Sequence, residues 1–473
     1  MKRLLLTLLL LVLPPAQPAQ STRQLVLTHV TVLDMTGAPA QPDRTVVITG
    51  DRITELGPSA GVQTPKDAQV VDATGKFLIP GLWDMHVHWF DKSYLPLFLA
   101  NGVTGIRQMW GMPFHHQWRQ EIEQGTLLGP RMEIPTAIVD GPKPIWPGSI
   151  AVKDAAEGRQ VVLQAKQEGA DFIKVYSRLP RDAYFAIADE AKKQGIPFAG
   201  HVPSAVTVIE ASDAGQKSIE HLTGVLEACS AREEELRKKS DEVMANLPPG
   251  KTFPDPASLR ALSRLRLDTF SPEKANALFA HLARNHTWQC PTLTVLRNMA
   301  FIQDPAIRND PRLKYMPAEI RSGWDPKGDF RLQDRTAEDY ELSQAAYRKQ
   351  KELVGPMRRA GVEFLAGTDV INPYCFPGFS LHDELGLLVE AGLSPLEALQ
   401  AATLNPARYL GREKDLGTVE KGKIADLVLL DANPLEDIGN SRKIEAVVFG
   451  GKLLPKAELE KMLGNIEALA NKK

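Results

Sequence analysis

The sequence predicts an α/β fold, a (β/α)8 TIM barrel joined to a small β-sandwich domain that is built from both chain ends. Three observations predict this fold. In the middle of the chain, eight short β-rich runs alternate with helix-length segments, as in parallel βα units. Short β-rich runs separated by turns occur near both chain ends. Polar residues of metal-binding type end several central runs, where the functional side chains of such barrels lie.

The predicted fold divides the 473 residues into four parts. These are a signal peptide (residues 1–20), a composite β-sandwich domain (21–76 and 413–455), a metal-dependent TIM-barrel domain (77–412) and a C-terminal helix (456–473). The chain is long enough for this arrangement, and its composition, 43% hydrophobic and 24% charged, is typical of a globular protein.

The first part of the chain has the organisation of a secretory signal peptide. Lys2 and Arg3 form a positively charged start, residues 4–13 are apolar, and residues 14–19 contain helix-breaking and small residues. The apolar stretch is too short to span a bilayer, so we expect no stable membrane insertion. We therefore expect a secreted or periplasmic protein.

Net charge restricts the partners of the chain, and cysteine content restricts its disulfides. A net charge of −2 gives no basis for binding nucleic acid. We expect a small-molecule substrate as the partner. The sequence is also compatible with assembly into a homo-oligomer. The three cysteines, Cys229, Cys290 and Cys375, cannot form a disulfide framework, and we expect no bridge between them.

The β-sandwich domain is predicted from short runs at both ends of the chain. The N-terminal runs are Leu25–Leu33, Thr45–Ile48, Arg52–Leu56 and Gln69–Val71. The C-terminal runs are Asp426–Leu430 and Lys443–Phe449, and Gly450-Gly451 forms a turn after them. One domain assembled from both ends, next to a central barrel, accounts for both sets.

The central runs supply the number of strands that a TIM barrel needs. They are Leu78–His88, Gly105–Trp110, Met132–Val139, Phe172–Tyr176, Pro197–His201, Ser218–His221, Thr287–Leu293 and Glu363–Asp369. The connections after His221 and after Leu293 are unusually long. Such connections lie over the active face of a barrel, so we expect them to form lids and substrate walls.

Several helices between these runs have recognisable ends. The segment Arg181–Gln194 is followed by Gly195, a residue type common just after a helix. Ser394 is an expected N-cap, with Pro395 at the first helical position and a capping-box glutamate after it. Asn405-Pro406 is expected to open the next helix in the same manner.

Residues of metal-binding type gather at the ends of five predicted strands. His86 and His88 are two residues apart, so a β-strand points both side chains to one face. The other four residues are Lys174, His201, His221 and Asp369. A lone histidine in such a run is more often structural, but the joint occurrence of these residues favours a metal site.

The segments that carry these residues resemble those of a known superfamily. They are Ile79–His88, Phe172–Val175, Gly200-His201, Ser218–His221, Gly367–Asp369, Glu390–Ala407 and Gly417–Asp426. The sequence resembles the metal-dependent amidohydrolase superfamily over nearly all of the chain after the signal peptide. Within it the sequence is similar to the imidazolonepropionase-like group, which includes secreted Xaa-Pro and Xaa-Arg dipeptidases and ochratoxin amidases.

The resemblance implies a binuclear metal centre with two divalent ions, expected to be zinc. It implies that Lys174 takes up carbon dioxide to form a lysine carbamate that bridges both metals. His86, His88 and Asp369 then bind one metal, and His201 and His221 bind the other. The alternative is a single-metal site in which Lys174 pairs with Asp369.

Such a site would cleave an amide bond by attack of a metal-bridging hydroxide. Asp369 is the expected proton acceptor and donor. Tyr176 lies two residues beyond Lys174 on the same strand face and could donate a hydrogen bond to the oxyanion. The alternative role of Tyr176 is that of an aromatic residue at the rim.

Dipeptides or N-acyl amino acids are the expected substrates. Many dipeptidases of the group have a histidine shortly after the aspartate that matches Asp369, and this chain has none until His382. A terminal carboxylate would need a cation, for which Arg178 and Arg297 are the candidates. The alternatives are a lactone or phosphotriester hydrolase with the same metals and a non-catalytic exported metal-binding protein.

Overall fold

The computed structural model describes residues 24–247 and 253–472. The predicted signal peptide lies outside these residues, so export stays a prediction. None of the described helices is long and apolar enough to cross a membrane. In the described part of the chain, Cys229, Cys290 and Cys375 are buried and unpaired with one another.

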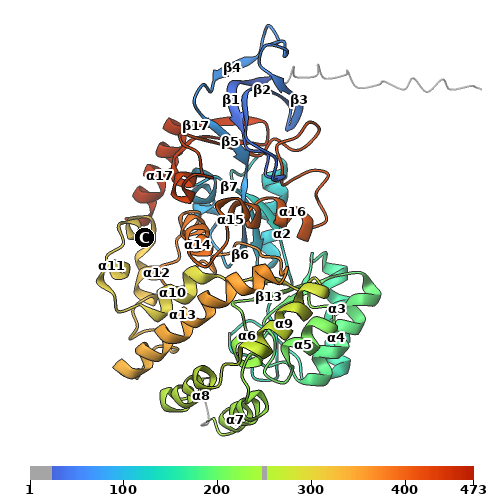
Figure 1. The fold of residues 1–473 in the computed structure, drawn as a ribbon, viewed down its shortest axis with the longest axis vertical. Coiled ribbons are helices and arrows are strands. Elements are labelled where there is room, and N and C mark those ends of the chain that lie inside the picture. The colour runs from blue at the N-terminus through green and yellow to red at the C-terminus, as the bar shows by residue number, and fades with distance from the viewer. Residues whose placement is uncertain (1–23, 248–252, 473) are drawn as a thin grey trace, which may run out of the picture.

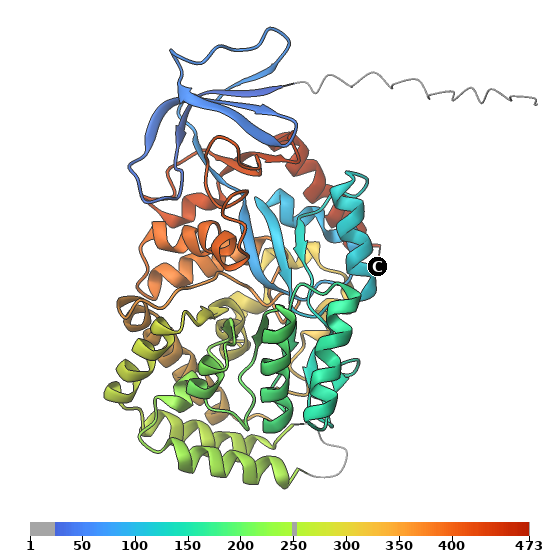
Figure 2. The same cartoon turned by 90° about the vertical axis from the view of Figure 1, so that its right-hand side faces the viewer.

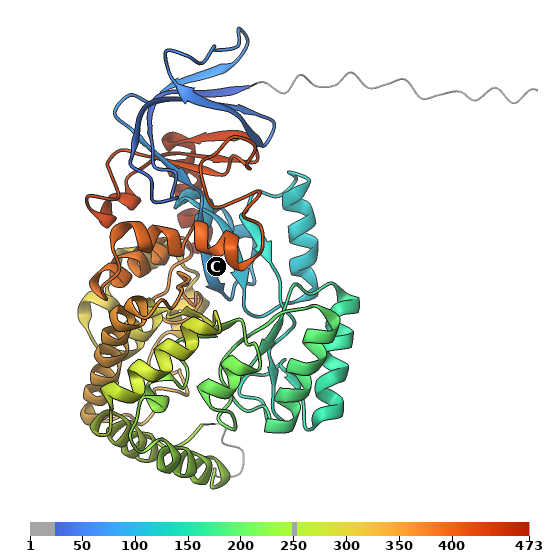
Figure 3. The same cartoon turned by 45° about the vertical axis from the view of Figure 1, so that its right-hand side comes forward.

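Strands from both ends of the chain form one eight-stranded sheet, in the order β17-β16-β15-β5-β1-β2-β3, with β4 paired to β1. The strands are β1 (Leu25–Val32), β2 (Gln41–Thr49), β3 (Arg52–Pro58), β4 (Gln69–Asp72), β5 (Phe77–Pro80), β15 (Leu427–Leu430), β16 (Ile444–Phe449) and β17 (Lys452–Pro455). Figures 2 and 3 show the red C-terminal strands next to the blue N-terminal ones. The two ends of the chain therefore share this sheet, which we call the terminal sheet. Its folding into a sandwich stays a prediction.

Strand β5 joins the two ends, because it pairs in parallel with β1 and antiparallel with β15. The predicted run Leu78–His88 is divided at Gly81 into β5 and β6 (Leu82–Val87). A Cβ atom on Gly81 would lie 2.1 Å from Thr104 Oγ1, so only glycine fits there. The structure thus places Phe77–Pro80 in the terminal sheet, whereas the predicted boundary assigns these residues to the barrel.

The central strands form two further sheets whose neighbours are all parallel. One contains β6, β7 (Val103–Gln108) and β8 (Arg131–Glu133). The other contains β10 (Ile150–Ala151), β9 (Val139–Asp140), β11 (Ile173–Val175), β12 (Phe198–Gly200), β13 (Ser218–Glu220) and β14 (Trp288–Cys290). The predicted run Met132–Val139 is therefore two short strands, β8 and β9.

Isolated parallel bridges connect these sheets. Pro135 bridges to Phe172, Gln289 to Phe364, and Val87 to Val370. The predicted eighth strand, Glu363–Asp369, is an extended segment between β14 and β6 that is joined to its neighbours by such bridges and by backbone hydrogen bonds instead of a continuous ladder. The order of contacts is the one expected for a (β/α)8 barrel, and its regular closure stays a prediction.

The connections between central strands are mainly helical. Up to β14 they contain η1 (Lys92–Tyr94), α1 (Pro96–Ala100), α2 (Pro113–Glu123), α3 (Ala155–Glu168), α4 (Arg181–Gln194), α5 (Val208–Asp213), α6 (Val225–Ala228), α7 (Glu233–Ala245), α8 (Pro256–Asp268) and α9 (Pro272–Arg284). Figure 1 shows α7 and α8 at the end of the molecule far from the terminal sheet.

The chain after β14 adds a second group of helices. They are α10 (Leu293–Ala300), α11 (Pro305–Arg308), η2 (Pro311–Tyr315), α12 (Ala318–Gly323), α13 (Ala337–Arg359), α14 (Phe379–Glu390), α15 (Pro395–Ala401), α16 (Leu404–Tyr409), η3 (Ile438–Arg442) and α17 (Lys456–Ala470).

The predicted helix ends are confirmed in two cases and shifted in a third. Gly195 ends α4 in the left-handed conformation, with φ 63°. Ser394 caps α15 and forms a capping box with Glu397. Helix α16 starts two residues earlier than expected, with Thr403 in the N-cap position in place of Asn405, whose side chain donates to the carbonyl of Phe364.

Candidate metal centre

The end of β6 places two imidazoles and a carboxylate together. His86 is completely buried in this strand, and His88 follows it on the same face. The Nε2 atoms of His86 and His88 lie 3.2 Å apart. Asp369 Oδ1 lies 3.3 Å from the former and 3.2 Å from the latter. Three of the predicted ligands therefore converge on one point.

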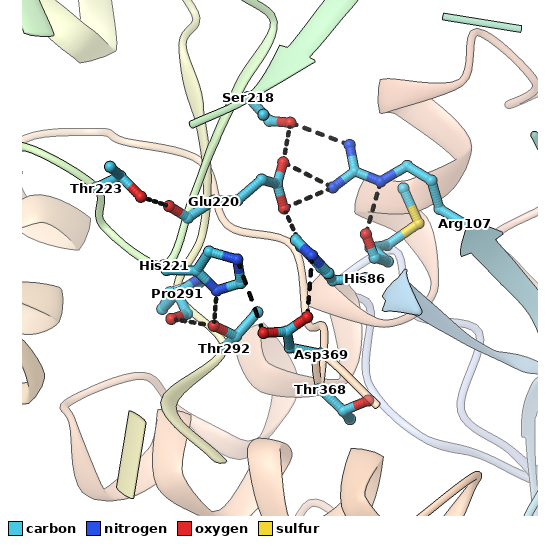
Figure 4. Close-up of polar contacts among 12 residues, drawn as sticks. His86, Arg107, Ser218, Glu220, His221, Thr223, Pro291, Thr292, Thr368 and Asp369 are labelled. Atoms are coloured by element: carbon cyan, nitrogen blue, oxygen red, sulfur yellow. Dashed lines mark hydrogen bonds and ion pairs between the residues drawn. The ribbon is translucent and has the colours of Figure 1, made fainter. Parts of the chain in front are cut away.

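The other two histidines come from neighbouring strand ends. His201 follows β12 and His221 follows β13, and their ring centroids are 5.0 Å apart. His221 lies 4.5 Å from His86, centroid to centroid, and its Nε2 atom lies 3.9 Å from Asp369 Oδ2. Ligand atoms of His86, His221 and Asp369 all lie within 4.8 Å of one another. Three of the predicted histidines thus lie around Asp369, and His201 lies next to His221 (Figure 4 shows His86, His221 and Asp369).

Hydrogen bonds to Nδ1 orient three of these rings. His86 Nδ1 lies 2.7 Å from Glu220 Oε2, and His201 Nδ1 lies 2.8 Å from Ser177 Oγ. His221 Nδ1 lies 2.6 Å from Thr292 Oγ1, which donates its own proton to the Pro291 carbonyl. His86 and His221 then carry the proton on Nδ1 and keep the Nε2 lone pair, as in metal-binding histidines.

Lys174 is buried in the middle of β11, between Ile173 and Val175. Its Nζ atom is buried and has no hydrogen-bond partner among the described residues. The nearest aromatic contact places Nζ 5.8 Å from the centroid of Tyr176. A buried amine without such a partner is costly, which indicates that a further group belongs at this position.

Burial sets the charge states in the centre. Burial, followed by the charge of Lys174, lowers the pKa values of His86 and His201 well below the usual range. Burial also lowers the pKa of Lys174 to about 8. Burial alone would raise the pKa of Asp369, but His221, His88 and Lys174 hold it below its usual value. His86 and His201 are therefore neutral and Asp369 is ionised, which is the state that metal binding needs.

Behind the ligands lies a buried ion pair that the sequence analysis did not assign. Glu220 receives two hydrogen bonds of 2.9 Å from Arg107, and it holds the His86 ring (Figure 4). Arg107 also donates to the Met85 carbonyl at 2.6 Å and to Tyr409 at 2.8 Å. A charged residue inside the apolar strand β7, and an acid directly before His221, were the available signals.

A second buried acid fixes the loop that carries Asp369. Asp84 accepts hydrogen bonds from the backbone and hydroxyl of Thr368, at 3.0 and 2.6 Å, and from the backbone of His86. Burial raises the pKa of Asp84 to about 7. Asp369 itself has a φ of 58°, a conformation that non-glycine residues adopt rarely. These bonds hold the Asp369 carboxylate against β6.

A cavity of about 640 Å³ opens from the centre. Its lining includes His88, His201, His221 and Asp369 and residues of the second long connection from Val295 to Arg331. The first long connection contributes no lining residue in the described part of the chain. The expected substrate wall therefore comes from the connection after β14.

Tyr176 lines the same cavity and stacks on His201, with centroids 4.0 Å apart. Its hydroxyl oxygen accepts a hydrogen bond of 2.9 Å from the Trp146 indole. Burial raises its pKa, so the hydroxyl is protonated at neutral pH. The contact with Trp146 uses the oxygen as an acceptor and leaves the hydroxyl proton available to a ligand in the cavity.

The two arginines predicted to bind a carboxylate do not line this cavity. Arg178 donates to the Lys143 carbonyl at 2.9 Å, and Arg297 turns to Asn298 Oδ1 at 3.1 Å. The lining contains Arg331, which the sequence analysis did not single out. No local pattern marked Arg331, because it lies in a long connection without strand periodicity.

The donor set fits two divalent cations. Imidazole nitrogens and carboxylate oxygens are the ligands that zinc takes in catalytic sites. Six ligand-type residues exceed what one tetrahedral ion can use. The bare amine of Lys174 does not fit as a ligand beside cations, but its carbamate does.

Comparisons with known proteins agree with this geometry. A model of the amidohydrolase family matches residues 77–454. An imidazolonepropionase of Shouchella clausii is 38% identical over 115 residues, which cover 22% of this chain and 25% of that protein. The match thus spans a quarter of the length of this curated relative.

Two solved structures share the fold over most of the chain. The bottromycin amidohydrolase has a TM-score of 0.73 at 24% identity and covers 97% of this chain and 94% of its own. A Xaa-Pro dipeptidase with bound methionine has a TM-score of 0.65 at 18% identity. The match covers 91% of this chain and 100% of the dipeptidase chain. The fold of the family is a TIM barrel, which confirms the predicted α/β class and barrel type. The chain belongs to the amidohydrolase family.

Proposed function

We propose that the protein is a binuclear metal-dependent hydrolase of amide bonds whose substrates are dipeptides or N-acyl amino acids. The observation that carries this proposal is the convergence of four histidines and Asp369 beside the buried amine of Lys174, which has no hydrogen-bond partner among the described residues. Family membership supports the reaction class.

The metals would be held by residues from five strand ends. His86, His88 and Asp369 would hold one divalent ion, expected to be zinc, and His201 and His221 the other. Lys174 would be shared by both as a carbamate, formed when its neutral amine adds carbon dioxide and releases a proton. A pKa near 8 makes the neutral amine accessible at neutral pH. When bound, the metals would activate water and polarise the scissile carbonyl.

Two residues of the chain would handle protons and charge. Asp369 would accept the proton of the attacking water and deliver it to the leaving nitrogen as the C–N bond breaks. The products are then a carboxylic acid and an amine, with one water consumed. The hydroxyl of Tyr176 would donate a hydrogen bond to the oxygen of the scissile carbonyl as it gains negative charge.

The location of the activity is a separate part of the proposal. The charged start and apolar stretch of residues 1–20 support export to the periplasm or the medium. Expression of the full chain in bacteria should yield a shortened protein outside the cytoplasm. Mass spectrometry that finds residues 1–20 on the exported protein would contradict cleavage of a signal peptide.

A hydrolysis screen tests the reaction. The protein, loaded with zinc in the presence of bicarbonate, is offered dipeptides, N-acyl amino acids, lactones and phosphotriesters. We expect amide cleavage, and Asp369→Asn should reduce turnover by about 10²–10⁴-fold with the fold intact. Turnover of the lactone or phosphotriester alone would favour the alternative hydrolase. Bound zinc with no turnover of any substrate would indicate a metal-binding protein.

A further inference from the structure

We propose that Arg331 binds the carboxylate of the substrate and that the aromatic lining of the cavity receives a neutral, apolar acyl group. This inference rests on the proposed function and narrows it, because it selects N-acyl amino acids over free dipeptides as the substrate class.

Arg331 is the only lysine or arginine among the described residues that line the cavity. Its Nε and Nη2 atoms bind Asp329 at 2.9 and 2.6 Å, and its Nη1 atom donates to Asn372 Oδ1 at 2.9 Å. The face of the guanidinium lies 5.6 Å from the centroid of Trp146. These contacts fix the guanidinium plane and use three of its five N–H groups, which leaves two for a ligand.

The guanidinium is also coupled to the catalytic residues. Asn372, which accepts from Arg331, donates to the Asp369 carbonyl at 3.0 Å. Burial alone would lower the pKa of Arg331, but Asp329, and then Asp369 and Tyr176, raise it above its usual value. Arg331 is therefore charged and interacts electrostatically with Asp369 and Tyr176.

The acids of the cavity do not suit a free ammonium group. The lining contains three described acids, Asp329, Asp369 and Glu319. Both oxygens of Asp329 accept from Arg331, and Asp369 belongs to the metal centre. Glu319 is exposed to solvent. The α-ammonium of a dipeptide would thus lack a buried partner, whereas a neutral acyl group needs none.

The rest of the lining is rich in aromatic side chains. These are Phe90, Trp110, Trp146, Tyr176, Trp324 and Phe330. Phe90 and Phe330 are 41% and 36% exposed, although large apolar side chains are usually covered. Exposed aromatic side chains beside a cavity are typical of surfaces that a ligand covers. The cavity therefore matches an apolar acyl group in size and polarity.

Binding of the substrate carboxylate by Arg331 is tested with N-benzoyl-L-phenylalanine and its C-terminal carboxamide. The measurement is the rate at which the zinc-loaded protein releases benzoate from each compound. Wild type should prefer the free acid. Arg331→Met should reduce kcat/KM for the acid by about 10–100-fold, mainly through KM, and leave the carboxamide within a few-fold. Arg331→Lys should keep part of the preference for the free acid, because lysine keeps the positive charge but cannot bind a carboxylate through two parallel N–H groups.

Arg321→Met is the matched control, because Arg321 is exposed on α12 and does not line the cavity. This variant should retain the wild-type preference. If Arg331→Met slows acid and carboxamide equally, Arg331 only supports the loop around Asn372 and the assignment is wrong. The assignment is also wrong if Arg178→Met or Arg297→Met, instead, removes the preference.

The acyl part is tested with L-phenylalanyl-L-phenylalanine, which has the same leaving amino acid and a free ammonium group. N-benzoyl-L-phenylalanine should be cleaved at least about 10-fold more efficiently, given the cost of burying an unpaired ammonium. Faster cleavage of the dipeptide would overturn the choice of N-acyl substrates. This result would leave the proposed amide hydrolysis intact.

Binding measurements separate this inference from the proposed function. If the zinc-loaded protein cleaves no amide, the proposed function fails, but the carboxylate site is still measurable by calorimetry with N-benzoyl-L-phenylalanine and its carboxamide. Tighter binding of the acid to wild type, lost in Arg331→Met, would support the site. Equal binding of acid and carboxamide to wild type would overturn it.

Discussion

At the scale of single residues, the buried ion pair of Glu220 and Arg107 decides how His86 can act. Neither side chain is exposed to solvent, and the two opposite charges neutralise each other in an ion pair. Because Glu220 also accepts from His86 Nδ1, the ring has one orientation and presents Nε2 to the centre. An acid in this place also raises the basicity of the ligand nitrogen.

Glu220→Gln tests this support of the ring. The amide can still accept a hydrogen bond, but it lacks the charge that pairs with Arg107 and strengthens the bond to His86. We expect zinc affinity to fall by about 10–100-fold, as is usual for the partners of metal-binding histidines. Competition with a chelator of known affinity measures the change. Wild-type affinity in the variant would show that the ring needs no carboxylate.

Lys174 is the residue that decides between one metal and two. Its amine is completely buried, and burial lowers its pKa. A cationic amine would repel divalent ions at this position, whereas a carbamate would attract them. The two alternatives of the sequence analysis therefore differ in metal content.

We expect wild type, refolded with bicarbonate and excess zinc, to contain about two equivalents of zinc. Lys174→Ala should bind fewer, because the shared ligand is lost, and elemental analysis measures the difference. One equivalent in wild type that Lys174→Ala leaves unchanged would rule out the carbamate and favour the single-metal site.

At the scale of elements, α10 is held in place by a residue of α14. Glu384 is buried and accepts hydrogen bonds from the backbone of Leu293 and Thr294, at 2.9 and 2.7 Å. These N–H groups begin α10 and have no helical partner. The residue before the helix is Thr292, the partner of His221 Nδ1. The capping of one helix thus positions the partner of His221, a predicted metal ligand.

Glu384→Ala should lower the free energy of unfolding by about 1–3 kcal/mol, because buried N–H groups lose their acceptor. It should also weaken zinc binding, because Thr292 loses its support. Ser394→Ala is the control, since it removes the cap of α15 at a cost of about 1 kcal/mol and lies away from the ligands. Equal zinc affinity of the two variants would contradict the link from α14 to His221.

At the scale of the whole molecule, His382 connects three parts of the chain. This buried histidine in α14 lies 3.0 Å from the carbonyl of Asn101, which follows α1, and 2.9 Å from the hydroxyl of Ser441 in η3. Nε2 donates to the Asn101 carbonyl, which can only accept, so a neutral ring presents the lone pair of Nδ1 to the Ser441 hydroxyl. Burial lowers the pKa of His382 to about 4 from an ordinary 6.5.

This shift makes the junction sensitive to acid. Because the pKa of His382 is lower in the folded than in the unfolded protein, the unfolded state binds more protons between pH 6.5 and 4. Stability is therefore complete above pH 6.5 and falls as the pH drops toward 4. The loss from this residue is on the order of 3 kcal/mol.

His382→Gln should remove this part of the pH dependence, because the glutamine amide can make both hydrogen bonds and does not titrate. Unfolding by denaturant at pH 7 and pH 4 measures the loss in wild type and in the variant. Acid release of metals affects both proteins, so the difference between them isolates His382. Identical losses would show that protonation of His382 does not open the junction.

The sequence by itself determined the parts of this protein that depend on local order. Strand periodicity places His86 and His88 on one face, and the end of a barrel strand fixes where Lys174 and Asp369 point. Helix capping at Ser394 and Gly195 is likewise a local property. These features need only nearby residues and the fold class, so their patterns are visible along the chain.

Only the tertiary structure decided the contacts between distant segments. Arg107 meets Glu220 from β7 and β13, which are far apart in the sequence. Strand β5 pairs with strands from both ends of the chain, and Gly81 after it allows close approach to Thr104. Arg331 reaches the cavity from an irregular connection, which has no periodicity to direct its side chain. Such contacts depend on packing across the fold, and for that reason the meeting of the strand-end residues was predictable while the position of Arg331 in the cavity was not.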